Sequence, residues 1–154
     1  MKRLIILLSL TIIMLTTACR EQKSIEQQMQ QKTTVCYHSI SNTDTAFLSI
    51  DTAAGRVIGL LEFHYTNDKK KYKGQFEGSI NKDTLKGHFD FKVNDVDKWY
   101  RNPVAFLKRN DKYIMGVGKF SMVWGSAYFD QKVPVNYEGG RFIFEKGDCE
   151  FRKR

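Results

Sequence analysis

The chain has 154 residues, 42% of them hydrophobic, three cysteines and a formal net charge of +8 at pH 7. This length is enough for one domain with a real core, but not for two. The sequence has no motif typical of a catalytic nucleophile or a phosphate-binding loop. We therefore expect a non-catalytic role, with no cofactor and no metal.

The N-terminal residues are typical of an export signal. Two cations precede a largely apolar run that ends in small residues before Cys19. Counted to Ala18, the apolar stretch is about 15 residues, shorter than the roughly 20 that a membrane-spanning helix needs. We therefore predict that residues 1–18 are a signal peptide rather than a permanent membrane span.

The end of this segment, Leu15-Thr16-Thr17-Ala18-Cys19, resembles the lipobox of bacterial lipoproteins. The usual leucine three positions before the cysteine is Thr16 here, with Leu15 one place further out. The resemblance implies that Cys19 carries a diacylglycerol and acyl chains that hold the protein at the cell envelope. Arg20 in place of an aspartate favours the outer membrane, on its periplasmic side or at the cell surface. An ordinary secretory signal is the alternative.

Residues 19–33 are polar, rich in glutamine and free of aromatic residues. Ile25 and Met29 are the sizeable apolar residues, and one such pair cannot hold an isolated helix in water. We expect a flexible tether that keeps the following domain, residues 34–154, roughly 20 Å from the lipid surface.

Cys36 and Cys149 lie near the two ends of this domain. An even pair of cysteines in an oxidising compartment predicts a disulfide, and two separate buried thiols are the alternative. A bridge over so long a loop would stabilise the fold by between about 4 and 5 kcal/mol. Their spacing fits neither a redox motif nor a zinc site.

Alternation of apolar and polar residues, interrupted by turn residues, predicts an all-β domain without helices. The alternation is clearest in the two segments 72–80 and 84–93, where one face is apolar and the other polar. We expect eight or nine strands, at residues 35–40, 45–52, 56–65, 72–80, 84–93, 104–108, 113–123, 126–133 and 141–146.

A single antiparallel meander β-barrel of about eight strands is the expected architecture, because closure removes both exposed edges. Gly59, Gly74, Gly78 and Gly87 fall on the apolar side of their strands, where glycine lets a strand coil. A two-sheet sandwich is the alternative. A barrel of this size is either filled by side chains or holds one small ligand, and the sequence favours neither.

Several motifs resemble small lipoproteins of Bacteroidetes-type bacteria: the lipobox, the tether, the segment 72–78 with its spaced aromatics and glycines, Asp83-Thr84-Leu85 and Gly147-Asp148-Cys149. The resemblance implies a lipocalin-like or calycin-like barrel and no particular activity. The Gly-x-Trp that marks true lipocalins is absent. The paired cysteines are also similar to those of β-barrel lipoproteins that inhibit lysozyme, but the Ser-Gly-aromatic of their inhibitory loop is missing.

Two groups of polar residues are candidates for chemistry. One holds the histidines with Glu62, which shares a strand face with His64; the other is a set of aspartates with cations interleaved. A surface metal site and acid/base catalysis are conceivable, but ordinary solvent-exposed side chains explain both groups. The residues are His38, Glu62, His64 and His88, and Asp90, Asp95 and Asp97.

Two aromatic-rich segments are the better candidates for binding. Residues 97–103, expected to form a long loop, include Trp99, Tyr100 and Arg101, and residues 124–129 include Trp124 and Tyr128. Aromatic residues and arginine on loops are typical of contact hot spots. We expect these five residues to contact a ligand or a partner; alternatively, the two tryptophans plug the ends of the barrel.

The positive charge adds a constraint on partners. Export makes nucleic acid an unexpected partner, whereas anionic lipids and envelope polysaccharides suit a basic surface. Two hypotheses follow: a binder of a small apolar or amphipathic ligand in or at the mouth of the barrel, or a protein-interaction or inhibitor module of the cell envelope.

Overall fold

The computed structural model describes residues 34–53 and 56–150, which fold into one all-β unit. The expected signal peptide (1–18), the expected lipid attachment at Cys19 and the expected tether (19–33) lie outside the described residues. No helix that could cross a membrane occurs in the part of the chain that is described.

The described residues form ten strands, and most of them match the alternating segments of the sequence. Their bounds are β1 (Thr34–Ser41), β2 (Asp44–Ala53), β3 (Arg56–Tyr65), β4 (Lys70–Asn81), β5 (Thr84–Val93), β6 (Tyr100–Arg109), β7 (Lys112–Met115), β8 (Phe120–Val123), β9 (Ser126–Phe129) and β10 (Ile143–Gly147).

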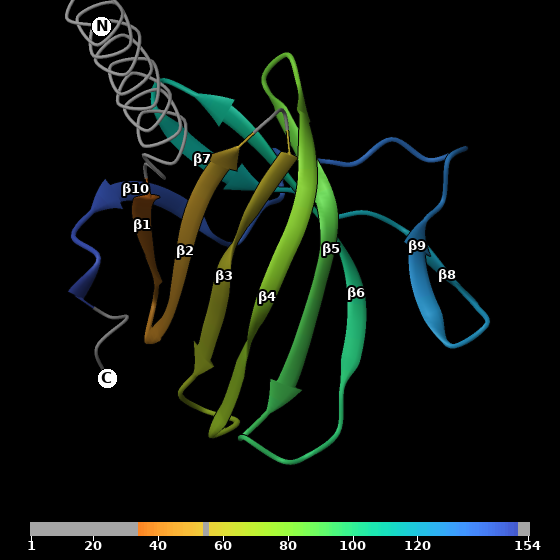
Figure 1. The fold of residues 1–154 in the computed structure, drawn as a ribbon, viewed down its shortest axis with the longest axis horizontal. Coiled ribbons are helices and arrows are strands. Elements are labelled where there is room, and N and C mark those ends of the chain that lie inside the picture. The colour runs from red at the N-terminus through yellow and green to blue at the C-terminus, as the bar shows by residue number, and fades with distance from the viewer. Residues whose placement is uncertain (1–33, 54–55, 151–154) are drawn as a thin grey trace, which may run out of the picture. The chain divides into compact units, whose positions relative to one another are not determined.

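Eight of these strands close into an antiparallel barrel, and β8 and β9 form a separate two-stranded sheet. Strands β1 to β7 pair in sequence order, and β10 closes the barrel between β7 and β1 (Figure 1). The predicted meander barrel is therefore confirmed, and the sandwich alternative is wrong. The β8–β9 hairpin is an insertion that stands beside the barrel wall.

The predicted disulfide is confirmed and lies at the point of closure. Cys36 of β1 is in register with Gly147 of β10. Cys149, just beyond the end of β10, is bonded to Cys36 with a Cα–Cα distance of 5.3 Å. The bond therefore joins the first strand of the barrel to the last.

Close approach of neighbouring strands explains two of the inward-facing glycines. A Cβ atom at Gly59 would lie 1.7 Å from the carbonyl oxygen of Ser49, and one at Gly74 would lie 1.8 Å from that of Asp90. Next to Gly59, the backbone N–H of Leu60 donates to Oγ of Ser49 at 3.0 Å. Glycine lets the strands coil tightly enough to close a small barrel.

The expectation of one strand over residues 113–123 is wrong. Strand β7 ends at Met115, and the chain leaves the barrel at Gly116, where a Cβ atom would lie 2.3 Å from the side chain of Val135. Alternation continues past this point, but it then belongs to β8, which pairs with β9 alone. The strand expected at residues 126–133 likewise ends at Phe129.

The prediction of a long loop at residues 97–103 is also wrong in part, because its second half belongs to a strand. Strand β6 begins at Tyr100, which is in register with Phe91, and Arg101 is in register with Asp90. Pro103 is tolerated because β7 pairs with β6 only from Phe106 onward, so the missing N–H leaves no ladder bond unmade.

The barrel interior is filled at the end that holds the β2–β3 and β4–β5 turns. Three phenylalanines, Phe76, Phe106 and Phe144, are fully buried there and pack edge to face, with ring centroids 5.6 to 5.8 Å apart. Leu48, Leu61 and Leu85 complete this part of the core. The opposite end is not filled in the same way, and a cavity opens there.

Candidate functional site

The open end of the barrel holds a cavity of about 330 Å³, which we call the cup. It lies at the end with the β3–β4 turn, opposite the end at which β1 begins. Pockets for small ligands are concave and mainly apolar, with a few placed polar groups, and their volumes start at about 300 Å³. The cup is lined by Phe63, Tyr65, Asp68, Tyr72, Phe89, Phe91, Asn102, Pro103, Val104, Met115 and Arg141.

Aromatic rings in mutual contact form the wall of the cup. The rings of Phe89 and Phe91 stack with centroids 4.7 Å apart, and Tyr72 packs against Phe91 at 5.4 Å. Tyr65 contacts Tyr72 edge to face at 5.3 Å. Such contacts hold each ring in a fixed orientation, so the wall is preformed.

An ion pair lies at the rim of the cup. The guanidinium of Arg141 donates to the carboxylate of Asp44, whose other oxygen accepts the backbone N–H of Thr66 at 2.8 Å. Arg141 also lies over the ring of Tyr65, at 5.5 Å from its centroid. Burial raises the pKa of Tyr65, so this phenol stays protonated at neutral pH. The rim thus offers a paired arginine, and the exposed carboxylate of Asp68 also lines the cup.

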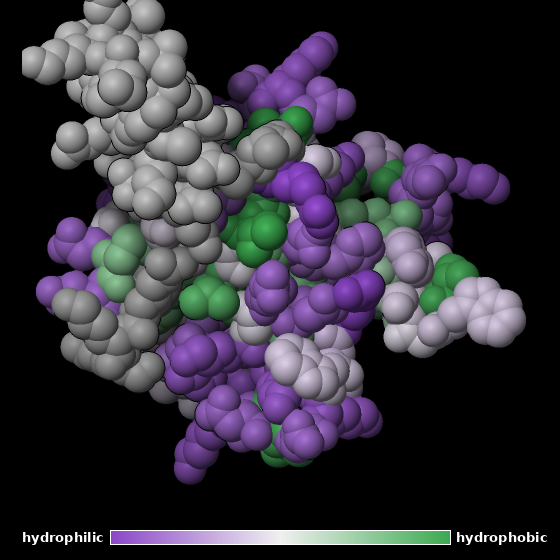
Figure 2. Space-filling view, viewed as in Figure 1, coloured by the Kyte–Doolittle hydropathy of each residue, from purple (hydrophilic) through white to green (hydrophobic). Residues whose placement is uncertain are grey.

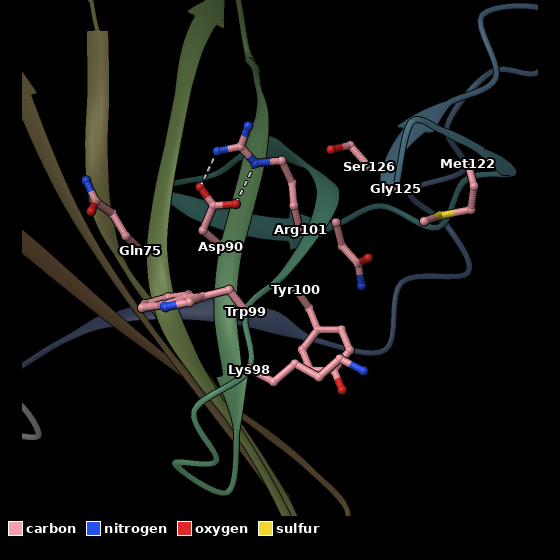
Figure 3. A pocket seen from close by; sticks show the side chains of 10 residues that line it. Gln75, Asp90, Lys98, Trp99, Tyr100, Arg101, Met122, Gly125 and Ser126 are labelled. Atoms are coloured by element: carbon pink, nitrogen blue, oxygen red, sulfur yellow. Dashed lines mark hydrogen bonds and ion pairs between the residues drawn. The ribbon is translucent and has the colours of Figure 1, made fainter.

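A larger cavity, of about 720 Å³, lies on the outside of the barrel, and we call it the outer groove. Residues from β4, β5 and β6 form its floor, and the β8–β9 hairpin forms the opposite side (Figure 3). It is lined by Gln75, Asp90, Lys98, Trp99, Tyr100, Arg101, Asn102, Met122, Gly125 and Ser126. Asn102 lines both the cup and the outer groove.

A bidentate ion pair is the fixed polar element of the outer groove. Nε and Nη2 of Arg101 donate to the two carboxylate oxygens of Asp90 at 2.5 and 2.6 Å. These hydrogen bonds lower the pKa of Asp90, so its carboxylate is charged at neutral pH. Gln75 is in register with Asp90 on the neighbouring strand, so the three side chains cross the floor of the groove in one row.

Trp99 lies in the turn between β5 and β6 and is 63% exposed. The Nζ atom of Lys92 lies 4.9 Å from the centre of the indole and also binds Asp97 at 2.7 Å. The indole lines the groove together with Gln75 and Asp90, and in Figure 3 the side chain of Tyr100 points away from it. The ring of Tyr100 stacks on Phe91 of the cup at 5.5 Å.

Trp124 and Tyr128 occupy the β8–β9 hairpin and do not line the outer groove. Trp124 is fully exposed at the hairpin turn. It and Gly125 both have positive φ, 51° and 79°, as a two-residue type I′ turn requires. Tyr128 packs edge to face on His88, with ring centroids 5.5 Å apart. In Figure 2 the hairpin projects from the molecule with pale and green atoms at its tip.

The histidines and aspartates do not form one common site, although two of the histidines lie together. His38 and His64 line one hollow with Glu62, to which His64 is paired, whereas His88 contacts the hairpin. Among residues 34–53 and 56–150, no group of three or more histidine, cysteine or acidic residues is arranged to hold a metal ion. Asp90 pairs with Arg101 and Asp97 with Lys92, so these two aspartates belong to separate ion pairs, and Asp95 lies exposed in the turn after β5.

A third hollow, of about 450 Å³, surrounds Glu62 on the outer face of β1 to β3. Glu62 is 13% exposed and lies 3.1 Å from Lys71 and 3.6 Å from Lys73. Burial alone would raise its pKa, but the hydrogen bonds with His64 and Lys71 and the charges of the two lysines lower it. These ion pairs link β3 to β4, because Glu62 lies on β3 and both lysines lie on β4.

Three of the five residues predicted to bind, Trp99, Tyr100 and Arg101, therefore lie together around one cavity. The residues that shape the two cavities with them carry no signal in the sequence: Gln75, Met122, and the pair Arg141 and Asp44. Alternation places Gln75 on the outer face of its strand, but it does not show which outer residues the hairpin approaches.

No protein-family model, no curated protein and no solved structure matches the chain.

Proposed function

We propose that the protein is a lipid-anchored lipoprotein of the cell envelope that binds a small apolar or amphipathic molecule in the cup. The observation that carries this proposal is the division of the barrel interior. One end is filled by phenylalanine and leucine, whereas the other keeps a cavity of about 330 Å³ with a preformed aromatic wall. An apolar ligand would gain burial there without any rearrangement of the core.

The polar rim suits an amphipathic molecule in particular. Asn102 and Arg141 would face a polar end group while the aromatic rings contact the apolar body. Because Arg141 is paired with Asp44, a full negative charge on the ligand is not needed. Binding in this form needs no catalytic group.

Filling the cup tests the proposal. Met115 lines the cup but not the outer groove, so Met115→Trp should occupy the cavity and weaken binding of the apolar probe N-phenyl-1-naphthylamine at least about tenfold. Ser79→Trp, on the outer face at the filled end, is the matched control. In native mass spectra, protein extracted from cells should carry a lipid-sized mass that Met115→Trp loses. Unchanged probe binding in Met115→Trp would refute a ligand in the cup.

The anchor has its own test, which does not depend on the cup. Cys19→Ser should move the protein from the membrane fraction to the soluble fraction, because no acyl chain can then be attached. Retention of Cys19→Ser in the membrane fraction would show that the lipobox interpretation is wrong.

The hairpin favours a second candidate function, a protein-interaction or inhibitor module. Residues 120–129 contain no charged side chain. Phe120, Met122 and Trp124 are exposed on the hairpin, and a projecting apolar patch of this kind is typical of a contact surface. Cross-linking in cells followed by mass spectrometry should identify an envelope protein bound to the native chain but not to Trp124→Ala, if this function is correct.

A further inference from the structure

The outer groove differs from the cup in chemistry as well as position. Its floor is a row of polar side chains on three strands, with exposed aromatic residues beside it, and it is open to solvent. An apolar molecule would remain half in water there. The groove therefore suits a ligand that has both an apolar face and many hydroxyl groups.

We propose that the outer groove binds an uncharged saccharide chain, with one sugar ring stacked on Trp99 and its hydroxyls hydrogen-bonded to Asp90 and Gln75. A pyranose ring has one face made of C–H groups, which packs on an aromatic ring, while its hydroxyls project around the edge. The volume of about 720 Å³ lies within the range of ligand pockets.

Trp99 supplies the stacking surface. The indole is 63% exposed, although Lys92 lies over it at 4.9 Å from the ring centre. A cation covers one face of a ring, so the other face remains available. Asp97 holds Lys92 by a hydrogen bond of 2.7 Å, which limits the movement of this support.

The row Gln75, Asp90 and Arg101 supplies the polar contacts. Asp90 is held by two hydrogen bonds from Arg101, and each carboxylate oxygen keeps a lone pair for a sugar hydroxyl. Gln75, one strand away, adds an amide that both donates and accepts. Such planar groups, fixed on a sheet, can bridge neighbouring hydroxyls without moving on binding.

Charge favours a neutral saccharide over a polyanion. The charges of Asp90 and Arg101 satisfy each other, so the polar row on the floor of the groove has no net charge. Lys98 adds one positive charge beside this row, where it lies over the ring of Tyr100 at 5.1 Å. The groove lies between the sheet and the hairpin residues Met122 and Ser126 and is open to solvent, which suits a chain rather than a single enclosed sugar.

The two tryptophans make a direct measurement possible. The whole sequence contains only Trp99 and Trp124, so Trp124→Phe leaves Trp99 as the sole indole. Full-length protein carrying Trp124→Phe would be titrated with soluble β-1,4- and α-1,4-linked glucan oligomers, mannan oligomers and N-acetylglucosamine oligomers. We expect at least one of them to shift the emission of Trp99 saturably, with little dependence on salt.

Variants then locate the site. Trp99→Ala should weaken binding of that oligomer at least about tenfold, measured by calorimetry, whereas Trp124→Ala should change it less than twofold. Gln75→Ala, an exposed position whose change leaves the core intact, should also weaken binding severalfold.

Three results would overturn the assignment. The first is that none of the oligomers gives a saturable response. The second is that Trp99→Ala binds the oligomer as tightly as the native protein does. The third is a co-purifying protein that binds the native chain but not Trp99→Ala. None of these results depends on binding of the naphthylamine probe in the cup. Failure of the groove proposal is therefore distinguishable from failure of the proposed function of the cup.

Discussion

Arg141 and Asp44 are separated by 97 positions in the chain, yet the guanidinium of one donates to the carboxylate of the other at the rim of the cup. The side chain of Asp44 is 5% exposed, whereas that of Arg141 is half exposed. The pair joins the start of β2 to the segment before β10, two parts of the barrel that are distant in sequence.

Removal of Arg141 should therefore destabilise the fold. Arg141→Ala leaves the carboxylate of Asp44 buried without its cation, and we expect a loss of about 1–3 kcal/mol in the free energy of unfolding. Urea denaturation measures it. The double variant Arg141→Ala with Asp44→Asn should recover part of this loss, because no buried charge then remains. A loss below about 0.5 kcal/mol, as for an ordinary surface pair, would contradict the prediction.

Loss of the disulfide should have the largest effect on stability. The bond between Cys36 and Cys149 spans 113 positions. Replacing both cysteines with alanine should lower the free energy of unfolding by about 4–5 kcal/mol at 25 °C. Guanidinium denaturation with and without reductant measures this, and the reductant should affect the native chain but not the double variant. Equal stability of the native chain in both conditions would show that the bond does not constrain the unfolded chain.

Glycines in the barrel wall should tolerate substitution very unequally. Gly59→Ala places a Cβ atom against the carbonyl of Ser49, which is backbone and cannot rotate away, so we expect a loss of at least about 3 kcal/mol or failure to fold. Gly139→Ala is the matched control, because its Cβ would meet the side chain of Asn136 at an ordinary 3.4 Å. Thermal unfolding of both variants checks the prediction, and equal melting temperatures would contradict it.

The charge on Glu62 should stabilise the fold in a pH-dependent way. Its pKa is lower in the folded chain than in the unfolded one, so the stabilisation is present above the unfolded value and is lost as the pH falls through the folded value. Glu62→Gln should therefore cost about 1 kcal/mol at pH 7. The difference from the native chain should shrink as the pH falls below about 4.3, the ordinary value for glutamate, and onward through the lower folded pKa. A difference independent of pH would mean that the carboxylate charge is not the cause.

The barrel could be predicted from the sequence because its strands obey a local rule. Strands β3 and β5 begin and end at the expected residues, since alternation and turn residues mark both ends. Closure was also predictable, because inward glycines and a cysteine near each end of the domain point to the same architecture.

The failures occurred where a tertiary contact decides the local structure. Gly116 ends β7 because another segment packs against it, and alternation carries no trace of that packing. Tyr100 extends a strand because Phe91 and Asp90 offer a partner edge, although Pro103 and the polar residues before it are typical of a loop.

The candidate sites were predictable only in part for the same reason. Trp99 and Arg101 were found by residue type, because exposed aromatics and arginine are typical of contacts. Gln75 and Met122 are ordinary residues that become part of a cavity when β4 and the hairpin come together. The position of the cup depends on how the aromatic side chains pack inside the barrel, and this packing cannot be predicted from the composition of the chain.

The bond between Cys36 and Cys149 also determines how the barrel responds to force. A pull on the start of β1 would ordinarily peel that strand away from its neighbours one hydrogen bond at a time. Because Cys36 is the third residue of β1 and is bonded to the far end of the chain, such a load passes into the segment after β10 instead. A pull on the start of β1 is therefore shared with the end of β10 for as long as this bond stays oxidised, so β1 cannot be peeled away alone beyond Cys36.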